Sequence, residues 1–195
     1  MVTIEQLFRQ AQQAGAAEIY LMAGRKPAAR IGGKIKNLDY PELSSTEAEK
    51  ILLEMLDAKQ AAQYRETKSV DEVIAFHGIG RFRVHIYQND GVPSACVKII
   101  NKKEGLPEEL KALAGITQGL VLVCGKPHSG KSATLAALAE QMLAGRFMHL
   151  VTLESPVEYP IEAGKGLLSR RCIGKDTGSY KEGMDTVSYT HLRAH

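Results

Sequence analysis

Residues 125–132 have the sequence GKPHSGKS, which satisfies the phosphate-loop pattern G-x-x-x-x-G-K-[ST] at every fixed position. The preceding segment, Leu120 to Cys124, is a continuous apolar run typical of a buried strand. The following segment, Ala133 to Ala144, has the composition and apolar spacing of a helix. Strand, glycine-rich loop and helix are the context that this motif requires. The sequence therefore predicts a nucleotide-binding loop at the start of a parallel α/β sheet.

The residue types of the loop indicate how it would hold ATP. Gly125 and Gly130 can adopt backbone angles closed to other residues, so successive amide groups can turn towards phosphate oxygens. Lys131 is expected to neutralise the β- and γ-phosphates, and the Ser132 hydroxyl to bind Mg2+. A glycine turn with an incidental lysine is the alternative, which the flanking elements disfavour. The expected nucleotide-binding residues are Gly125, His128, Ser129, Gly130, Lys131, Ser132 and Ala133.

Composition limits the kinds of partner that need to be considered. The 195 residues are 44% apolar and 24% charged, as in an ordinary soluble globular protein, and a net charge of +3 does not argue for a nucleic-acid partner. Three cysteines, an odd number and far apart, fit a reducing compartment. The N-terminal stretch has no apolar signal-peptide core, and no run reaches membrane-spanning length. We expect a cytoplasmic protein without membrane insertion.

The first hundred residues carry the pattern of an α+β domain. Thr3 and Gln6 form a capping box that starts a helix ending near Gly15, and Gly32-Gly33 indicates a two-residue hairpin turn. The expected strands are 18–22, 28–31, 34–38, 70–76, 81–88 and 93–100, and further helices begin after Ser44 and at Ala58. A polar connector over 101–112 leads to a second domain, 113–186, whose next strand is expected at 149–153.

The last nine residues are a special case. Residues 187–195, VSYTHLRAH, match the translation of a transposase sequencing adapter, so we expect this tail to be artefactual and the natural chain to continue beyond Asp185. A metal-binding tail containing His191 and His195 is the alternative, but it lacks ligand spacing. The second domain is then too short for the further strands and acidic motif that nucleotide hydrolysis needs.

Five segments, in order and with matching spacing, resemble the retraction ATPases of type IV pili, the PilT family of secretion-type motors. GAAEIYL at 15–21 resembles the family's GASDLHL, and GRFRV at 80–84 resembles its RFRV strand. GLVLV at 119–123 leads into the phosphate loop as it does there. TLESPVEY at 152–159 resembles the acidic box TIEDPIEY, and RRCIGKDT at 170–177 resembles QREVGRDT. The resemblance covers nearly all of residues 1–184.

The resemblance implies an α/β protein with an N-terminal PAS-like domain and an incomplete RecA-like P-loop ATPase domain. It also implies a homohexamer with ATP at its subunit interfaces. An inner-membrane pilus platform protein would be the partner, which places the motor at the inner face of the cell membrane. The Walker B glutamate and histidine box expected of the family lie beyond the present sequence, so this chain alone is predicted to be inactive.

Two groups of residues outside the loop are candidates for catalysis. Glu154 and Glu158 match the two glutamates of the acidic box, where carboxylates after a strand neighbouring the phosphate-loop strand could hold Mg2+ through water or orient the attacking water. Arg81, Arg83 and Lys98 could contact a neighbouring subunit's γ-phosphate in trans, as an arginine finger does. The alternatives are loop carboxylates paired with lysines, and a solvated strand face.

Departures from the family pattern leave the function open. Ser155 replaces an aspartate, Tyr20 a histidine and Lys98 an arginine, and Lys126-Pro127-His128 stands for Pro-Thr-Gly. The leading interpretation is a motor subunit that couples ATP hydrolysis to pilus disassembly. A non-hydrolysing nucleotide-binding paralogue and an assembly or type II secretion ATPase are the alternatives.

Overall fold

The computed structural model describes residues 3–101 and 105–191, the last four of these by backbone only. The chain divides into two compact units, Met1–Asn101 (unit 1) and Lys102–His195 (unit 2), and each is described by itself. Residues 102–104 of the expected connector and residues 192–195 of the expected tail lie outside the described residues. Within the described part, no helix is both long enough and apolar enough to cross a membrane.

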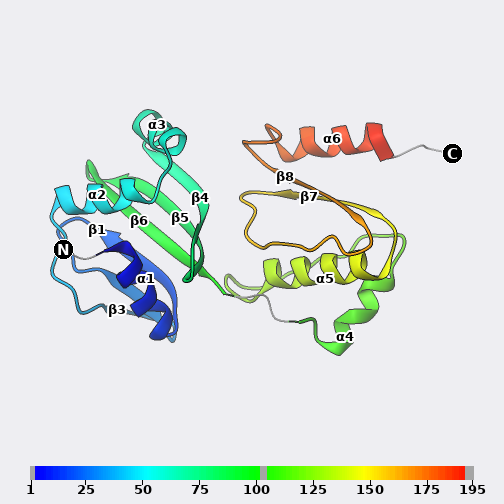
Figure 1. The fold of residues 1–195 in the computed structure, drawn as a ribbon, viewed down its shortest axis with the longest axis horizontal. Helices are drawn as coiled ribbons and strands as arrows, with labels where there is room; N and C mark the ends of the chain where they lie inside the picture. Colours follow the sequence, from blue (N-terminus) through cyan, green and yellow to red (C-terminus); the bar gives the residue numbers. More distant parts are fainter. Residues whose placement is uncertain (1–2, 102–104, 192–195) are drawn as a thin grey trace. The chain divides into compact units, whose positions relative to one another are not determined.

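Unit 1 is built on a six-stranded sheet with the order β3-β2-β1-β6-β5-β4, all neighbours being antiparallel (Figure 1). The strands are β1 Ala16–Met22, β2 Ala28–Ile31, β3 Lys34–Asn37, β4 Ser69–Phe76, β5 Gly80–Asn89 and β6 Val92–Ile100. Gly32 and Gly33 have φ values of 57° and 78°, as the predicted hairpin turn between β2 and β3 requires. All six expected strands of this region are present.

Three helices in unit 1 begin at capping boxes. They are α1 Ile4–Gln13, α2 Ser45–Glu54 and α3 Ala58–Thr67. The N-cap side chains of Thr3, Ser44 and Asp57 each accept a hydrogen bond from the amide three residues later, and that residue's side chain accepts one in return. These reciprocal bonds satisfy amides that the first helical turn leaves unpaired, so they fix where each helix begins.

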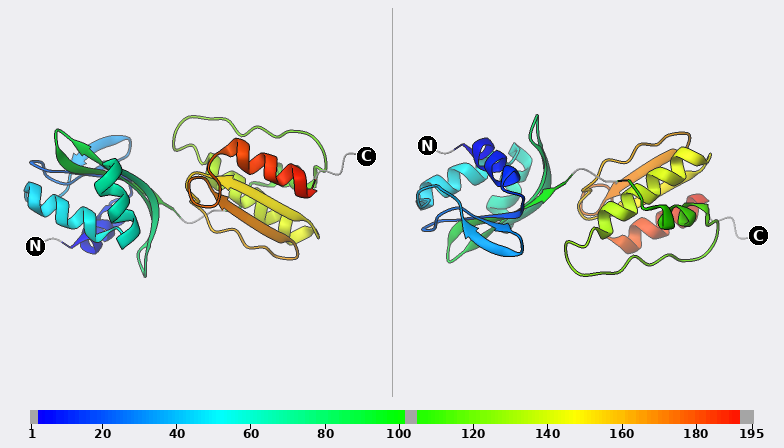
Figure 2. Two further views of the ribbon diagram at one scale, coloured as in Figure 1. Left: turned by 90° about the horizontal axis from the view of Figure 1, so that it is seen from above. Right: turned by 90° about the horizontal axis from the view of Figure 1, so that it is seen from below.

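The helices of unit 1 cover one face of its sheet (Figure 2). Side chains alternate along each strand, so Ile19, Phe82 and Val84 are buried against the helices while their neighbours point to the other face. Phe8 of α1 lies at the centre of this core, with its ring centroid 4.2 Å from that of Phe82 and 5.2 Å from that of Phe76. We call the opposite side, with Glu18, Tyr20, Arg30, Arg83, Cys96 and Lys98, the open face.

Unit 2 contains a parallel strand pair with a helix on each side (Figure 1). Its elements are α4 Glu108–Lys111, the 3-10 helix η1 Ala112–Gly115, α5 Lys131–Gly145, β7 His149–Glu154, β8 Leu167–Cys172 and α6 Tyr180–His191. The helix and strand expected after the loop correspond to α5 and β7. The sequence did not suggest β8, because two leucines followed by Ser169, Arg170 and Arg171 show neither alternation nor a long apolar run.

The expected buried strand at 120–124 is wrong for this structure. The segment pairs with no strand of the described residues, and Leu120 and Leu122 are 82% and 74% exposed. A strand exists only where neighbours accept its amide hydrogen bonds, and in unit 2 β7 pairs with β8 and not with this segment. The related expectation that β7 neighbours the phosphate-loop strand is therefore also wrong.

The helical spacing of the sequence predicts Leu135, Leu138 and Met142 on the apolar face of α5. In the structure Leu138 is buried but Leu135 is half exposed, and the buried positions are Ala136, Ala137, Leu138 and Leu143. The small alanines allow a close approach of backbone, so they occupy the packed side of the helix. Residues 163–166 lie against the C-terminal end of α5, where Lys165 and Gly166 both donate backbone hydrogen bonds to the carbonyl oxygen of Leu143.

Candidate nucleotide-binding site

The phosphate loop ends where α5 begins. Gly130 is the N-cap of α5 with a φ of 89°, and no side chain caps the helix. The first amide groups of a helix have no partner within it, and a helix N-terminus carries partial positive charge. An uncapped N-terminus directly after a glycine-rich loop therefore offers backbone donors to an anion such as a phosphate group.

Lys131 turns its side chain back over the loop. Its Nζ donates to the carbonyl oxygen of Gly125 at 3.1 Å and to that of Lys126 at 2.8 Å. These contacts hold the ammonium group against the loop backbone. Phosphate oxygens are stronger acceptors than carbonyl oxygens, so a bound phosphate would compete for the same ammonium group.

Gly125 lies close to the side chain of Ser129 within the loop. A Cβ atom at this position would lie 2.7 Å from the Oγ of Ser129, closer than real Cβ contacts. The amide of Ser129 donates to the carbonyl oxygen of Lys126 at 3.3 Å, which closes a turn over residues 126–129. This turn and the contact of Lys131 with Gly125 bring the two ends of the loop together.

His128 adopts an unusual backbone conformation in that turn. Its φ is 61°, in the left-handed region that costs a residue with a side chain about 1–2 kcal/mol. Pro127 and His128 are the two central residues of the turn, and a positive φ at the second central position is the type II arrangement, which favours glycine or asparagine. The loop therefore keeps a glycine-like backbone with an imidazole attached.

Ser132 lies in the first turn of α5 and is exposed, with Ala133 following it. Among the described residues, no group of three or more histidine, cysteine, aspartate or glutamate side chains is placed to hold a metal. Mg2+ keeps most of its water and usually takes one or two protein ligands together with substrate phosphates. The hydroxyl of Ser132 fits such a cation, which would arrive with a nucleotide.

The two candidate glutamates have different surroundings. Glu154 is the last residue of β7, and the carboxyl end of β7 lies at the same end of unit 2 as the start of α5 (Figure 1). Its Oε1 accepts a hydrogen bond of 2.7 Å from the Thr152 hydroxyl. Glu158 belongs to the connection between β7 and β8 and is only 6% exposed. The structure therefore places Glu154 at the loop end of the unit and buries Glu158.

The three candidate trans residues belong to unit 1, whereas the loop belongs to unit 2. Arg81 and Arg83 lie on β5 and Lys98 on β6, where Arg83 and Lys98 are directly paired across the strands. Arg83 makes a two-point contact with Asp71, from Nε to Oδ1 at 2.9 Å and from Nη2 to Oδ2 at 2.6 Å. Any role for Arg83 at a phosphate would thus compete with Asp71.

A polar network on the open face was not anticipated from the sequence. Arg30 donates from Nε to Glu18 Oε2 at 2.7 Å and from Nη2 to the Tyr20 hydroxyl at 2.7 Å, and Tyr20 donates in turn to Glu18. Burial, and then the hydrogen bond to Glu18, raises the pKa of Tyr20 to about 12. The alternation that puts Glu18 and Tyr20 on one face was visible, but their pairing with Arg30 depends on the β1–β2 register.

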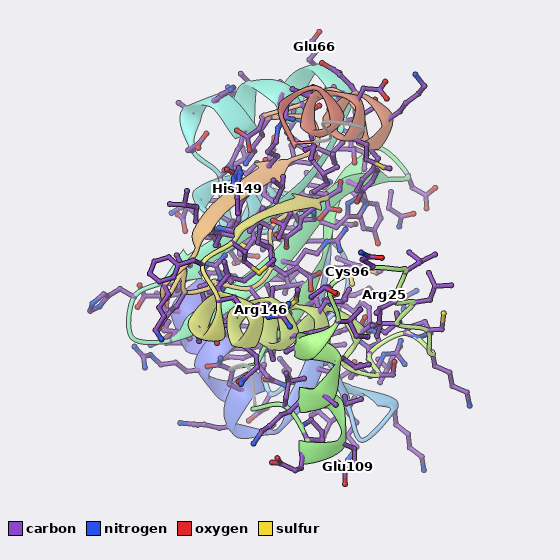
Figure 3. The ribbon with its side chains drawn as sticks, turned by 90° about the vertical axis from the view of Figure 1, so that its right-hand side faces the viewer. Arg25, Glu66, Cys96, Glu109, Arg146 and His149 are labelled. Atoms are coloured by element: carbon purple, nitrogen blue, oxygen red, sulfur yellow. The ribbon has the colours of Figure 1, made fainter. Side chains whose placement is uncertain are left out.

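Arg146 and His149 lie at the far end of unit 2 from the loop. Arg146 follows α5 and donates from Nη1 to the carbonyl oxygen of Ile116 at 3.3 Å, and His149 opens β7 with Nε2 2.8 Å from the Ser169 hydroxyl (Figure 3). Since the loop precedes α5 and both residues follow it, they take no part in the candidate site.

Comparison with known proteins finds relatives among the type IV pilus ATPases. No family model matches the chain. The chain is 30% identical over 190 residues to the type IV pilus retraction ATPase PilT of Pseudomonas aeruginosa, covering 93% of this chain and 54% of the relative. It is 27% identical over 183 residues to the type IV pilus ATPase PilU of the same organism, with coverages of 91% and 48%.

The fold agrees with the sequence comparison. A crystal structure of the pilus retraction motor PilT with bound ADP matches with a TM-score of 0.82 and 31% identity, over 97% of this chain and 57% of that one. The mixed α/β architecture is therefore the PilT fold. The chain spans about half the length of the relatives that it matches.

Proposed function

We propose, from the premise that this chain belongs to the PilT family of type IV pilus ATPases, that it is an ATP-binding subunit of a pilus retraction motor. In this proposal, ATP hydrolysis by the complete protein drives pilus disassembly. The PAS-like and RecA-like domains, with boundaries near 100 and 113, belong to the same proposal.

The observation that carries the proposal is the geometry of the phosphate loop. The loop ends on the uncapped N-terminus of α5, and the ammonium group of Lys131 is held against the carbonyl oxygens of Gly125 and Lys126. Amide donors and a lysine ammonium group in this arrangement suit a nucleoside di- or triphosphate. ATP would contact residues 125 and 128–133, and Mg2+ would bind Ser132.

The chemical step is proposed to involve the acidic box at residues 152–159 and a neighbouring subunit. Glu154 would orient the attacking water or hold Mg2+ through water, because it ends β7 at the loop end of the unit. Glu158 would contribute less to orienting water or holding Mg2+, because its burial limits contact with water. In a homohexamer, Arg81, Arg83 and Lys98 would approach the γ-phosphate in trans and stabilise the developing charge.

The remaining parts of the proposal concern the cellular setting. The motor would be cytoplasmic, at the inner face of the cell membrane, and would act on an inner-membrane pilus platform protein. Sequence similarity to two pilus ATPases supports this setting. An assembly or secretion ATPase of the same superfamily is the related alternative.

A non-hydrolysing nucleotide-binding subunit is the second candidate function. It is favoured by the burial of Glu158 and by Ser155, which leaves the acidic segment with one carboxylate fewer than the family pattern. Such a subunit would bind ATP without turnover. Steady-state ATP hydrolysis by the complete gene product would rule it out, and loss of that hydrolysis in Glu154→Gln would support the role of Glu154.

Nucleotide binding by the present chain is the direct test. Calorimetric titration with ADP and Mg2+ is expected to show binding, which Lys131→Ala weakens about ten- to hundredfold, because a hydrogen bond to a charged group contributes about 1.5–3 kcal/mol. Lys181→Ala is the matched control, since this lysine lies on α6 with its side chain 87% exposed. Equal affinity of wild type and Lys131→Ala would refute the proposed site.

A further inference from the structure

The outermost strand of the unit 1 sheet has an open edge. In the order β3-β2-β1-β6-β5-β4, β3 comes last and, among the described residues, pairs only with β2 (Figure 1). All four of its residues, Lys34–Asn37, are exposed. A strand in this position presents a row of backbone amide and carbonyl groups with which another chain can pair. The edge is therefore open to strand addition.

The register of β3 decides on which face its charged side chains lie. Lys34 is opposite Ile31 and Lys36 is opposite Ala29, and directly paired residues of antiparallel strands have their side chains on the same face. Ala29 is fully buried in the core that the helices cover. Both lysines therefore lie on the helix-covered face of the sheet, at its margin, where they stay exposed.

The single apolar residue of β3 lies on the other face. Ile35 is opposite Arg30, which belongs to the open face, and is 59% exposed. The charged residues thus take the side on which the neighbouring strands carry buried apolar residues. A strand added at this edge would place its side chains beside both lysines and remove water from the ammonium groups. That removal is costly unless each ammonium group finds an acidic partner.

The opposite edge of the sheet has a comparable feature. β4 is the other outer strand, and its Glu72 is opposite Val84, which is fully buried in the core. Glu72 therefore lies on the helix-covered face as well, where it is 7% exposed. Charged residues on the inward side of an outer strand discourage pairing with further strands. Each of the two outer strands thus carries charge on that side.

We propose that Lys34 and Lys36 prevent unit 1 from joining a second copy of this chain through β3. A twofold antiparallel contact between two β3 strands is the most direct pairing, and it brings the lysines of one copy beside those of the other. Like charges opposite each other on adjacent strands are destabilising. The exposed backbone edge is thereby kept from self-association. This inference does not depend on nucleotide binding by unit 2.

Hydrogen exchange measured by mass spectrometry on the full chain tests the proposal. Peptides that contain residues 34–37 report on the β3 backbone separately from any association through unit 2. Lys34→Thr/Lys36→Thr removes both charges and favours a strand, whereas Lys34→Glu/Lys36→Glu keeps a charge at both positions. Lys26→Gln/Lys59→Gln is the matched control for net charge, since both lysines are exposed and lie outside the strands.

Exchange in β3 of the threonine variant is expected to slow about three- to fivefold between dilute and concentrated solution, because pairing protects the edge amides. Wild type, the glutamate variant and the control should show no such slowing. Slowing in any of these three would overturn the proposal, because charge on β3 would then not be what prevents pairing. Its absence in a threonine variant with the circular dichroism spectrum of wild type would also overturn it. Should the double variant unfold, Lys36→Thr alone provides the same test.

Discussion

Single residues organise the open face of unit 1. Glu18 and Tyr20 stand two residues apart on β1, and the register of β2 places Arg30 opposite Glu18. The Arg30 guanidinium carbon lies 5.7 Å from the centroid of the Tyr20 ring, a cation–π arrangement that adds to the hydrogen bonds. Tyr20 stands where the family pattern has a histidine, so a neutral phenol here replaces a group that titrates near neutral pH.

The raised pKa of Tyr20 gives a prediction at this scale. Its phenol should ionise about two pH units above the ordinary value of 10.0, near 12, chiefly because burial disfavours the phenolate. A pKa raised on folding means that the contribution to stability is complete below pH 10 and is lost as pH rises through 12. The pKa of Tyr20 can be measured by NMR titration of the tyrosine Cζ resonances, with Tyr20→Phe used to assign the signal.

Glu18→Gln tests how much of the raised pKa of Tyr20 is due to the carboxylate of Glu18. Removing the carboxylate should lower the pKa of Tyr20 without returning it to the ordinary value, because burial is the larger effect and the hydrogen bond to Glu18 the second. Ionisation of wild-type Tyr20 near pH 10 would contradict the burial seen in the structure.

The phosphate loop shows what the sequence could and could not predict about a site. The sequence predicted that a helix follows the loop, and α5 begins at Lys131. The conformation of His128 could not be predicted, because nothing in the residue type indicates a positive φ; the turn imposes it. The sequence also could not predict that Glu158 is more buried than Glu154, because this difference depends on the path of the chain after β7.

At the scale of elements, the C-terminal half of α5 is held by the segment before β8. The amides of Lys165 and Gly166 bond to the Leu143 carbonyl oxygen at 3.0 and 3.3 Å, so the segment satisfies a group at the helix end. Gly166 also lies against the Leu143 side chain and the Met148 carbonyl oxygen. This contact fixes the start of β8 beside β7, and thereby the parallel pair that carries Glu154.

Gly166→Ala is expected to destabilise unit 2 by about 1–3 kcal/mol, the usual cost of overpacking. The added Cβ would lie 2.5 Å from Leu143 Cδ2 and 2.8 Å from the Met148 carbonyl oxygen, and the backbone oxygen cannot move aside cheaply. Urea unfolding followed by far-UV circular dichroism measures the change.

Gly145→Ala is the matched substitution in the same region. A Cβ on Gly145, the last residue of α5, meets nothing within 4 Å, and alanine favours a helix by up to about 1 kcal/mol over glycine. Stability should therefore stay equal or rise in this variant. Equal stability of the two variants would show that residues 163–166 do not pack against α5 as described.

At the scale of the whole molecule, the two units differ in how well they bury apolar surface. The main core, around Phe8 and Phe82, lies entirely in unit 1. Of the exposed large apolar side chains in the described residues, all except Ile35 belong to unit 2. They include Leu120, Leu122, Phe147, Leu167 and Met184. Unit 1 therefore has what an independent domain needs, whereas unit 2 exposes apolar surface that promotes association.

A fragment of residues 1–101 is expected to be soluble and to unfold cooperatively, and the full chain to associate as its concentration rises. Removing unit 2 removes all of these exposed apolar side chains except Ile35 and leaves the core of unit 1 intact. Size-exclusion chromatography with light scattering, and thermal unfolding of both proteins, measure this difference. Phe8→Ala in the fragment should cost about 3–5 kcal/mol. A full chain that stays monomeric at high concentration would contradict the prediction.

The sequence by itself determined the local features of this protein. Capping boxes, the Gly32-Gly33 turn, strand alternation in unit 1 and the phosphate-loop motif all depend on residues close together in the chain, so short-range hydrogen bonds and backbone preferences suffice to specify them. Tertiary structure alone decided whether 120–124 forms a strand, which glutamate is buried and which partner holds Arg83. Those outcomes depend on hydrogen bonds and burial supplied by segments distant in sequence, which no local pattern records.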